Sequence, residues 1–532
     1  MSKITVSKPH LKWLFGGMGF HNSEATMTAL MSEKVKNEVV LKSFREISPT
    51  FSRVFAVYAD WSKEAMDAFA LFYDLTYRKA GTLVYAVPGR MPYITDEDDA
   101  NDYAEKVAQK LHYLINERNC TKIRYYCLTN ELSVGNTYCH FKNDMELFKK
   151  YNEALFKAFR RYGLDVGLIA SDAANEEHFY LTNWVAENMD EITHTYCNHL
   201  YSVNTDLPPG DLRAYDHYVK AITPLVELAH SKEKRFMLGE FGVRTIPNTT
   251  LSPMMNDSNF SADHLALQGN FALAFAELAM AAINCGCLAT AYWTLFDYPN
   301  PVIRENGDTA EEKARYDAAR FSGHGMEIRY NKNGLIRWND TDKDYRSYAS
   351  LYALGYFAKL FRKNTWVLDT KWDDDFIRGC SVIGDDGKLS IAVLNWDEKE
   401  KVTHLSLDFK VDKRARMYVF EANNVPFNDF NDLQPHSAVL ELKEDTKITL
   451  PPKSLVFFTT DYEDRTPSRV KGVHTKGDRL VWKESKDKEH TYYRVFKDNK
   501  QIASTVANEL KIQDKKAKYT VISVDKWGNA GK

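Results

Sequence analysis

The chain has 532 residues, 44% of them hydrophobic and 27% charged, which is enough for two or three domains that each bury a core. Its 70 Lys and Arg residues nearly balance its 73 Asp and Glu residues, so charge gives no support for a nucleic acid or an acidic membrane surface as a partner. The seven cysteines, an odd number in mostly apolar segments, show no Cys-x-x-Cys motif and no Cys/His cluster with zinc spacing. We therefore expect reduced thiols and no metal site. The amino terminus lacks the apolar core of a signal peptide, which predicts a cytoplasmic protein unless an export signal has been removed.

The first 300 residues alternate between short β-branched or aromatic runs and longer helical stretches, a pattern typical of βα units around a parallel sheet. Eight runs are predicted as strands, at residues 12–16, 52–58, 82–87, 122–129, 166–171, 193–201, 235–239 and 288–295. Helices are predicted at residues 62–80, 100–118, 144–162, 175–188, 212–230 and 263–284. Eight such strands predict a closed (β/α)8 TIM barrel with its active site at the carboxyl ends of the strands. A doubly wound open sheet is the second interpretation, but no Gly-x-Gly-x-x-Gly follows any strand.

The segment 271–293 is apolar and about as long as a membrane span. Glu277, Asn284 and Gly286 interrupt it. A buried helix followed by a buried parallel strand explains the segment better, because in a β/α protein such a pair also forms one long apolar run.

After a helix predicted at 345–361, the pattern changes to short alternating strands that predict a β-sandwich. These strands are predicted at residues 389–394, 402–407, 417–420, 438–442 and 447–460. A polar, Pro-containing linker at 461–467 precedes a last stretch that resembles one fibronectin type III unit, with Leu480-Val-Trp, Tyr492-Tyr-Arg-Val-Phe and Trp527-Gly-Asn-Ala. The predicted domains are therefore a barrel (1–362), a β-sandwich (363–462) and a fibronectin type III-like domain (463–532).

Two glutamates lie at the carboxyl ends of predicted barrel strands, Glu131 after 122–129 and Glu240 after 235–239. A carboxyl group placed where a buried strand ends is shifted by desolvation and by its neighbours, which suits acid–base or nucleophilic chemistry. Cleavage of a glycosidic bond with retention needs a protonated carboxyl for the leaving oxygen and a carboxylate about 5 Å away to attack the anomeric carbon. The two glutamates suit these roles by position.

The pair Asn130-Glu131 and the turn Gly239-Glu-Phe-Gly242 resemble the marks of clan A retaining glycoside hydrolases, and the resemblance covers about the first 360 residues. The β-xylosidase and arabinosidase branches are the most similar, because their sixth strand also has a His-x-Tyr pattern. The resemblance implies a TIM barrel glycosidase that uses no cofactor and acts on an oligosaccharide or polysaccharide.

The resemblance also implies roles for residues on other strands. Arg53 would support the nucleophile, His199 or Tyr201 would order the same carboxylate, and Trp293 would form the floor of the sugar site. Glu131 would be the general acid/base, Glu240 the nucleophile, and Asn130 would hold the sugar hydroxyl next to the anomeric carbon.

The glycine-rich stretch from Gly16 to Asn22 lacks the Lys-Ser/Thr of a phosphate loop, so we interpret it as a tight turn that brings His21 or Asn22 to the sugar site. Three alternatives to a β-glycosidase remain open. They are an endo-acting β-glycanase on the same scaffold, a noncatalytic carbohydrate-binding protein, and a metal-dependent hydrolase, which the lack of clustered His and Asp ligands at strand ends disfavours. The sequence does not indicate the sugar or the oligomeric state.

Overall fold

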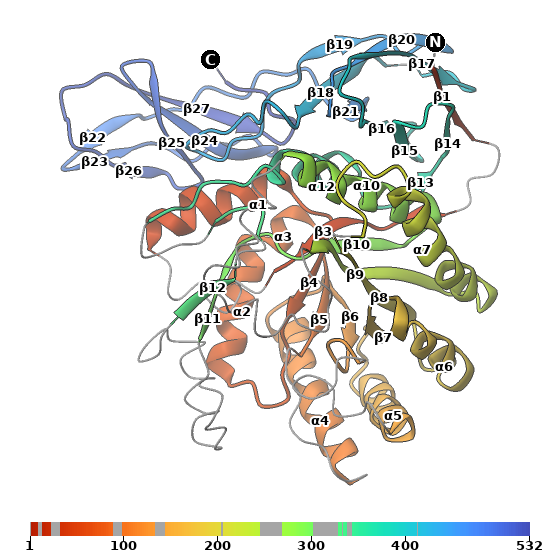
Figure 1. Cartoon of the computed structure of the whole chain (residues 1–532). Coiled ribbons are helices and arrows are strands. Elements are labelled where there is room, and N and C mark those ends of the chain that lie inside the picture. The colour runs from red at the N-terminus through yellow and green to blue at the C-terminus, as the bar shows by residue number, and fades with distance from the viewer. Residues whose placement is uncertain are drawn as a thin grey trace.

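The computed structural model describes residues 2–8, 13–22, 32–88, 98–132, 144–203, 206–244, 269–301, 328–331, 334–337, 343–411 and 413–531. Eight parallel strands form a closed barrel, in which each strand pairs with its neighbour in the chain and the last pairs with the first (Figure 1). This confirms the predicted TIM barrel. The strands are β3 (Gly17–His21), β4 (Phe51–Phe55), β5 (Leu83–Val87), β6 (Ile123–Cys127), β7 (Gly167–Ala174), β8 (Thr195–Val203), β9 (Arg235–Arg244) and β10 (Ala289–Tyr292).

Helices connect the strands and cover the outside of the barrel. They are α2 (Lys63–Leu75), α3 (Tyr77–Ala80), α4 (Asp98–His112), α5 (Met145–Arg161), α6 (Tyr180–Asn188), α7 (Ala214–Ser231) and α10 (Gly269–Cys285). Ser62 and Asp144 cap α2 and α5 by accepting hydrogen bonds from backbone N–H groups in the first turn. All six predicted helices are present, although residues 263–268 of the last lie outside the described residues.

The apolar segment that ends at Trp293 is a buried helix, α10, followed by strand β10, as the sequence predicts. No described helix combines the length and the hydropathy that crossing a membrane would require.

The first predicted strand, at residues 12–16, is wrong. The barrel strand is β3, which lies within the glycine-rich stretch that the sequence analysis interprets as a tight turn. A Cβ atom on Gly19 would lie 1.4 Å from the carbonyl oxygen of Phe51, so the glycine is needed for the close approach of two strands. The short strand β2 (Leu14–Phe15) pairs instead with β13 (Thr365–Val367), outside the barrel.

The region predicted as a β-sandwich has one four-stranded and one seven-stranded sheet, ordered β14-β1-β17-β20 and β19-β18-β21-β16-β15-β13-β2. Strand β1 (Ser2–Ser7) lies inside the smaller sheet, and Ile4 and Val6 are buried in its core, so the amino terminus belongs to the sandwich and not to the barrel. The region predicted as one strand at 447–460 is two, separated at Pro451–Lys453. The other strands are β14 (Asp369–Trp372), β15 (Ile377–Gly384), β16 (Leu389–Asn395), β17 (Lys401–Leu407), β18 (Ala415–Glu421), β19 (Ala438–Leu440), β20 (Asp445–Leu450) and β21 (Ser454–Thr459).

The carboxyl-terminal part forms two three-stranded antiparallel sheets, ordered β22-β23-β26 and β25-β24-β27. Trp482, Tyr493 and Val495 lie in the core between them. The strands are β22 (His474–Lys476), β23 (Arg479–Val481), β24 (His490–Lys497), β25 (Lys500–Thr505), β26 (Glu509–Lys511) and β27 (Tyr519–Asp525).

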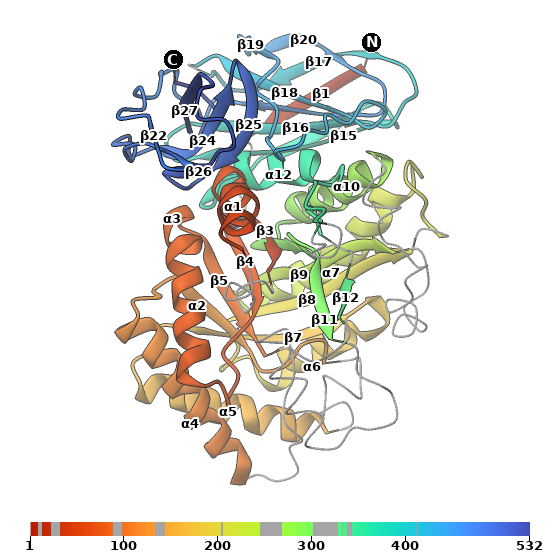
Figure 2. The same ribbon diagram turned by 90° about the vertical axis from the view of Figure 1, so that its left-hand side faces the viewer.

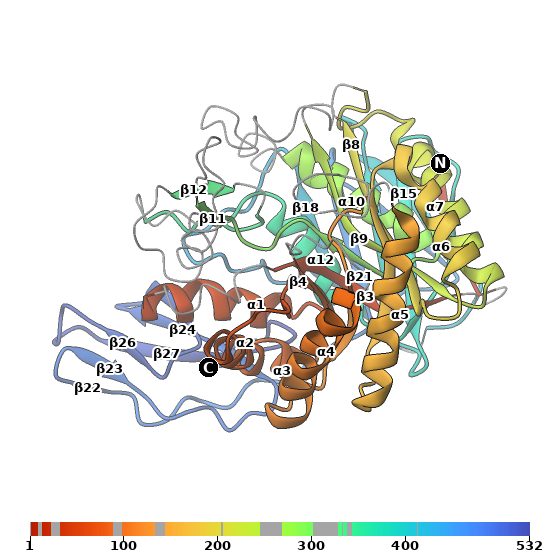
Figure 3. The same ribbon diagram turned by 90° about the horizontal axis from the view of Figure 1, so that it is seen from below.

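Both β domains lie on the same side of the barrel. Helices α10 and α12 (Leu351–Leu360) separate the barrel strands from the sandwich (Figures 1 and 2). The carboxyl-terminal sheets lie beside α1 (Leu41–Ile47), which precedes β4, and α1 contacts β24 (Figure 3). The last domain is therefore packed against the barrel as well as against the sandwich.

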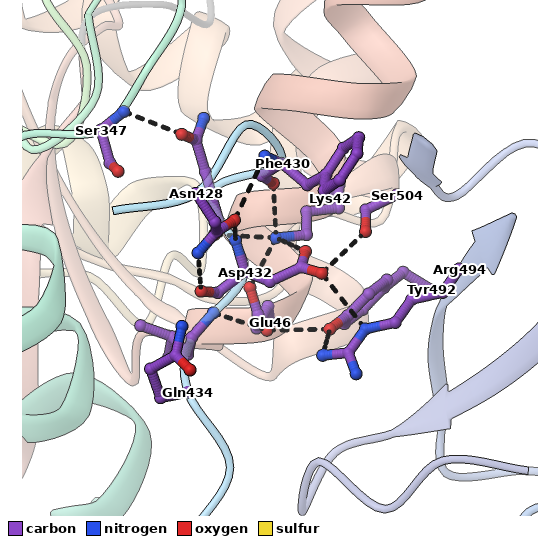
Figure 4. A network of polar contacts seen from close by, with 12 residues as sticks. Lys42, Glu46, Ser347, Asn428, Phe430, Asp432, Gln434, Tyr492, Arg494 and Ser504 are labelled. Atoms are coloured by element: carbon purple, nitrogen blue, oxygen red, sulfur yellow. Dashed lines mark hydrogen bonds and ion pairs between the residues drawn. The ribbon is translucent and has the colours of Figure 1, made fainter. Parts of the chain in front are cut away.

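A buried polar network joins the three predicted domains where α1 meets the carboxyl-terminal sheets (Figure 4). Lys42 of α1 forms ion pairs with Glu46, at 2.7 Å, and with Asp432 of the sandwich, at 2.6 Å. Asp432 also accepts hydrogen bonds from Arg494 of β24 and from Ser504 of β25. Because two cations face two carboxylates, the charges of the network are balanced.

We expect Asp432→Ala to lower the free energy of unfolding by about 3 kcal/mol or more, because it leaves Lys42 and Arg494 with too few anionic partners in a buried place. The neighbouring Asp429 is exposed, so Asp429→Ala is a matched control with a small expected effect. Urea unfolding of the full chain measures both. Equal losses in the two variants would show that the network does not stabilise the domain junction.

Candidate active site

The predicted site residues meet at the carboxyl ends of the barrel strands. Each comes from a different part of the barrel sequence, and the closed sheet brings them together. Arg53 lies on β4, Asn130 and Glu131 follow β6, His199 and Tyr201 lie on β8, and Glu240 lies on β9.

Arg53 is the centre of the site and is fully buried. Its Nη1 atom donates to Glu240 Oε1 at 2.5 Å, and its Nη2 atom donates to Asn130 Oδ1 and to Asp172 Oδ2, both at 2.6 Å. Burial alone would lower the pKa of Arg53, but Asp172 and Glu240 outweigh it and hold the pKa well above its usual value. The guanidinium thus orients three groups of the site at once.

Glu240 is 3% exposed and has a donor on each carboxylate oxygen. Oε1 accepts from Arg53, and Oε2 accepts from the Tyr201 hydroxyl at 2.6 Å. Burial raises the pKa of the Glu240 carboxyl above its usual range, against the opposing charges of His199 and Arg53, and the charge of Glu131 adds to the rise. The two glutamates therefore influence each other's protonation.

His199 lies between the two glutamates. Its Nδ1 atom is 3.0 Å from Glu131 Oε1 and 3.5 Å from Glu240 Oε2. The nearest ligand atoms of Glu131, His199 and Glu240 all lie within 4.8 Å of one another, so the two carboxyl groups face each other across a short gap. The Glu131 side chain is 18% exposed and is the more accessible of the two glutamates.

Asp172 is a member of the site that the sequence analysis misses. It is fully buried and accepts hydrogen bonds from Arg53 at 2.6 Å and from the Tyr85 hydroxyl at 2.8 Å, while His199 Nε2 lies 3.1 Å away. Burial alone would raise the pKa of Asp172, but Arg53 and His199 outweigh it and hold the pKa well below its usual range. Its signal in the sequence is the same as for Glu131, a carboxyl group directly after a predicted strand, here 166–171.

Two of the acidic residues have a left-handed backbone, with φ of 51° for Glu131 and 56° for Asp172. This conformation is uncommon for a glutamate such as Glu131, where it costs on the order of 1 kcal/mol or more, and is less unusual for an aspartate such as Asp172. The surrounding hydrogen bonds hold it, including the one from the Glu131 N–H to Asp172 Oδ2 at 3.4 Å. Such conformations cluster at functional sites.

The remaining predicted residues lie at the same end of the barrel. His21 Nδ1 is 3.2 Å from Arg53 Nη1, and the His21 ring lies 4.2 Å from the Trp293 ring and 4.4 Å from the Phe55 ring, between centroids. Asn22 is buried, and neither polar atom of its side chain has a hydrogen-bond partner among the described residues. An unpaired buried amide is costly, so Asn22 suits a polar ligand.

Gly239, which precedes Glu240, is enclosed by the site. A Cβ atom there would lie 2.5 Å from Cys197 Sγ and 3.3 Å from both Asp172 Oδ1 and His199 Nε2. Glycine at this position lets the end of β9 approach β8.

We expect Gly239→Ala to displace Glu240 and to reduce catalytic efficiency by about 100-fold, because a misplacement on the order of 1 Å has an effect of this size. Gly355, on α12, is a matched control, since a Cβ atom there meets nothing closer than 3.6 Å. The measurement is kcat/KM together with the melting temperature. Unchanged kcat/KM in Gly239→Ala would contradict the close packing described here.

Two groups of described residues place three metal-ligating atoms within 4.8 Å, Glu131/His199/Glu240 and Asp172/Cys197/His199. Their chemistry does not suit a metal ion. Both nitrogens of His199 already face carboxylates, and burial raises the pKa of the Cys197 thiol well above its usual value, with a further rise from Asp172. These contacts agree with the expectation that the site needs no metal, which stays a prediction.

No protein-family model matches the sequence, and a search of curated proteins finds no match either. Solved structures do share the fold. A glycoside hydrolase family 30 subfamily 8 xylanase from Clostridium acetobutylicum has a TM-score of 0.56 and 12% identity, with 86% of this chain and 99% of that chain covered. The catalytic domain of a family 30 xylanase from Talaromyces cellulolyticus has a TM-score of 0.58 and 14% identity, with 86% and 99% covered.

A family 51 arabinofuranosidase from Xanthomonas axonopodis pv. citri is similar to the same degree, with a TM-score of 0.55, 12% identity and coverage of 86% and 100%. At these identities the likeness shows the fold. The chain therefore has the fold of clan A glycoside hydrolases, a TIM barrel with an additional β domain, as the sequence resemblance implies.

Proposed function

We propose that the protein is a retaining β-glycosidase that hydrolyses glycosidic bonds of plant-type or microbial oligosaccharides or polysaccharides. The observation that carries this proposal is the pair of carboxyl groups at the barrel mouth, whose nearest oxygens lie within 4.8 Å of each other. Retaining glycosidases have carboxyl groups about 5–5.5 Å apart, whereas inverting enzymes need about 6.5–9.5 Å to leave room for water. From nearest oxygens this close we infer a carboxyl separation in the retaining range, which favours attack by a glutamate over attack by water.

The surroundings of the two glutamates support different roles. Glu240 receives hydrogen bonds from Arg53 and Tyr201, which stabilise the charged carboxylate that a nucleophile requires. Glu131 is the more exposed and so the better placed to reach a leaving group. We therefore assign Glu240 as the nucleophile and Glu131 as the general acid/base.

The reaction then has two steps. In the first, Glu240 attacks the anomeric carbon while Glu131 gives its proton to the leaving oxygen, and a glycosyl ester forms on Glu240. In the second, Glu131 takes a proton from water, and the water oxygen replaces Glu240 at the anomeric carbon. Asn130, whose Oδ1 atom accepts from Arg53 at 2.6 Å, would bind a sugar hydroxyl beside Glu131. The half-buried Trp293 would offer a ring face to the sugar, with the buried His21 packed against it at 4.2 Å between ring centroids.

An endo-acting β-glycanase on the same scaffold is the second candidate. Structures with this fold include an endo-β1,6-glucanase as well as xylanases and arabinofuranosidases, so the fold accommodates cleavage inside a polymer. The last domain, which we continue to expect to be fibronectin type III-like, packs against the barrel and is a candidate for positioning a polymer.

The test is a panel of aryl β-glycosides and oligosaccharides offered to the wild type and to a Glu131→Ala/Glu240→Ala double variant. We expect turnover by the wild type of at least one β-linked sugar, loss of turnover in the double variant, and no effect of a metal chelator. Release of single sugars supports the exo mode, and release of oligomers supports the endo mode. Binding without turnover would instead support a noncatalytic carbohydrate-binding protein, and loss of activity with chelator would support metal-dependent hydrolysis.

A further inference from the structure

Both ring nitrogens of His199 face carboxylate oxygens. Nε2 lies 3.1 Å from Asp172 Oδ1, and Nδ1 lies 3.0 Å from Glu131 Oε1 and 3.5 Å from Glu240 Oε2. A neutral imidazole has one N–H donor and one lone pair. The ionised carboxylates of Asp172 and Glu240 can only accept, and a protonated Glu131 still accepts through its carbonyl oxygen. The geometry is therefore satisfied best when both nitrogens carry a proton, as in an imidazolium.

Asp172 is the carboxylate that the proposed reaction does not use. It is fully buried between Arg53, Tyr85 and His199, and the Cys197 thiol lies 3.2 Å from its Oδ1 atom. A buried carboxylate is costly without a cation, and Asp172 has the permanently charged Arg53 at 2.6 Å, so its charge is fixed. A fixed anion on Nε2 stabilises the protonated ring of His199.

The charged groups that surround His199 lead to the same conclusion. Burial alone would lower the pKa of His199, but Glu240 and Asp172 outweigh it and raise the pKa to about 10. The titratable or charged groups around this cluster include Cys197 and Tyr201 of the same strand and, from other parts of the barrel, His21, Arg53, Tyr85, Glu131, Asp172 and Glu240. A ring with this pKa remains protonated throughout the ordinary range of pH.

We propose that Asp172 holds His199 as a permanent imidazolium, and that this cation stabilises the Glu240 carboxylate in the resting enzyme and the Glu131 carboxylate in the glycosyl–enzyme. This inference rests on the proposed glycosidase mechanism. Asp172 acts through His199 and is a positioning residue, whereas His199 touches both reacting carboxyl groups.

The charges balance in both states. In the resting site Arg53 and His199 are positive, Asp172 and Glu240 are negative, and Glu131 is protonated, so the five groups sum to zero. When Glu131 gives its proton to the leaving oxygen, it becomes negative, while Glu240 becomes a neutral ester, and the sum is again zero. The second step reverses both changes, because a proton from water returns to Glu131 as the ester is cleaved. A buried site thus never holds a net charge, which would be costly.

The first test observes His199 directly, on full-length protein labelled with ¹⁵N-histidine, with the His199 signals assigned by their loss in His199→Gln. We expect both ring nitrogens of the wild type to stay protonated between about pH 6 and 9. In Asp172→Asn, we expect the ring to lose a proton within this range. A wild-type His199 ring that is neutral, or that titrates between about pH 6 and 9, overturns the proposal, and this result needs no substrate.

The second test is kinetic and has Tyr85→Phe as its matched control. Tyr85 donates to the same Asp172 oxygen as His199, so its loss removes a hydrogen bond and keeps the charge. We expect Asp172→Asn to reduce kcat/KM by about 10²–10³-fold and to move the alkaline limb of its pH profile to lower pH, because His199 then loses its proton, and the cation that the reaction needs, at a lower pH. We expect Tyr85→Phe to keep the wild-type limb and to lose less activity.

The outcomes separate the inference from the proposed function. No turnover by the wild type on any glycoside contradicts the glycosidase proposal, while the ¹⁵N signals still decide the state of His199. An active wild type together with an unshifted pH profile in Asp172→Asn contradicts the role of Asp172. Equal losses in both variants, with unshifted profiles, show that Asp172 is only a structural residue.

Discussion

Glu240→Ala is expected to reduce kcat/KM for every substrate by on the order of 10⁴–10⁶-fold, the effect of removing a nucleophile. The large effect follows from the role we assign to Glu240, whose two carboxylate oxygens accept hydrogen bonds from Arg53 and Tyr201. Activated aryl glycosides should not restore the rate, since the missing step is the attack itself. The measurement is steady-state release of the aryl alcohol.

Azide makes this prediction more specific. With Glu240 removed, azide occupies the space of the carboxylate and attacks the anomeric carbon once, so the glycosyl azide should have inverted configuration. Glu227→Ala is a matched control, because Glu227 is an exposed glutamate on α7 away from the site and its loss should leave kcat/KM unchanged. Near wild-type activity in Glu240→Ala would exclude Glu240 as the nucleophile.

Glu131→Ala is expected to depend on the leaving group. For natural sugars, which need a proton on the leaving oxygen, kcat/KM should fall by about 10²–10⁴-fold, the usual contribution of a general acid. For an aryl glycoside with an acidic phenol, the first step should proceed almost normally, because such a phenolate leaves without a proton. The glycosyl ester on Glu240 should then accumulate, since the base for the second step is missing.

Azide distinguishes this variant from the first one. It should attack the accumulated ester in place of water and give a glycosyl azide with retained configuration, together with a faster turnover. An inverted azide from Glu131→Ala, or an equal loss of rate for good and poor leaving groups, would exclude Glu131 as the acid/base. The expected opposite configurations from the two variants also test the assignment of roles within the pair.

The sequence predicts much of the barrel because apolar residues recur with different spacings in its strands and in its helices. Seven of the eight predicted strands overlap the strands of the barrel, and the order of the elements follows from the chain. The exception, at residues 12–16, arises because Gly17 and Gly19 resemble a turn in sequence. Glycine in a strand can equally mark a close approach of two backbones, which only the position of Phe51 reveals.

Long-range pairing is the part of the fold that local patterns cannot show. Strand β1 joins the sandwich by pairing in parallel with β17, about 400 residues away in the chain, so no composition change near Ser2–Ser7 indicates its domain. The same holds for Lys42 and Asp432, whose buried ion pair joins the barrel to the sandwich. A charged pattern on a helix usually indicates an exposed face, and only the docked domains bury it.

The site was predictable where a motif or a family pattern marks a residue. Glu131, Glu240 and their neighbours lie together as their positions at strand ends suggest. Asp172 was missed because no motif surrounds it, although it follows a predicted strand directly. Its importance depends on the contacts with Arg53 and His199, which come from strands β4 and β8 and have no counterpart in the local sequence.

The central claim, that Glu240 attacks the sugar across a short gap from Glu131, is tested most directly by the configuration of the first product. Proton NMR during hydrolysis of an active aryl β-glycoside by the wild type distinguishes the β-anomer from the α-anomer before mutarotation mixes them. We predict that the β-anomer appears first, since two displacements retain the configuration. The α-anomer as the first product would contradict the proposed mechanism.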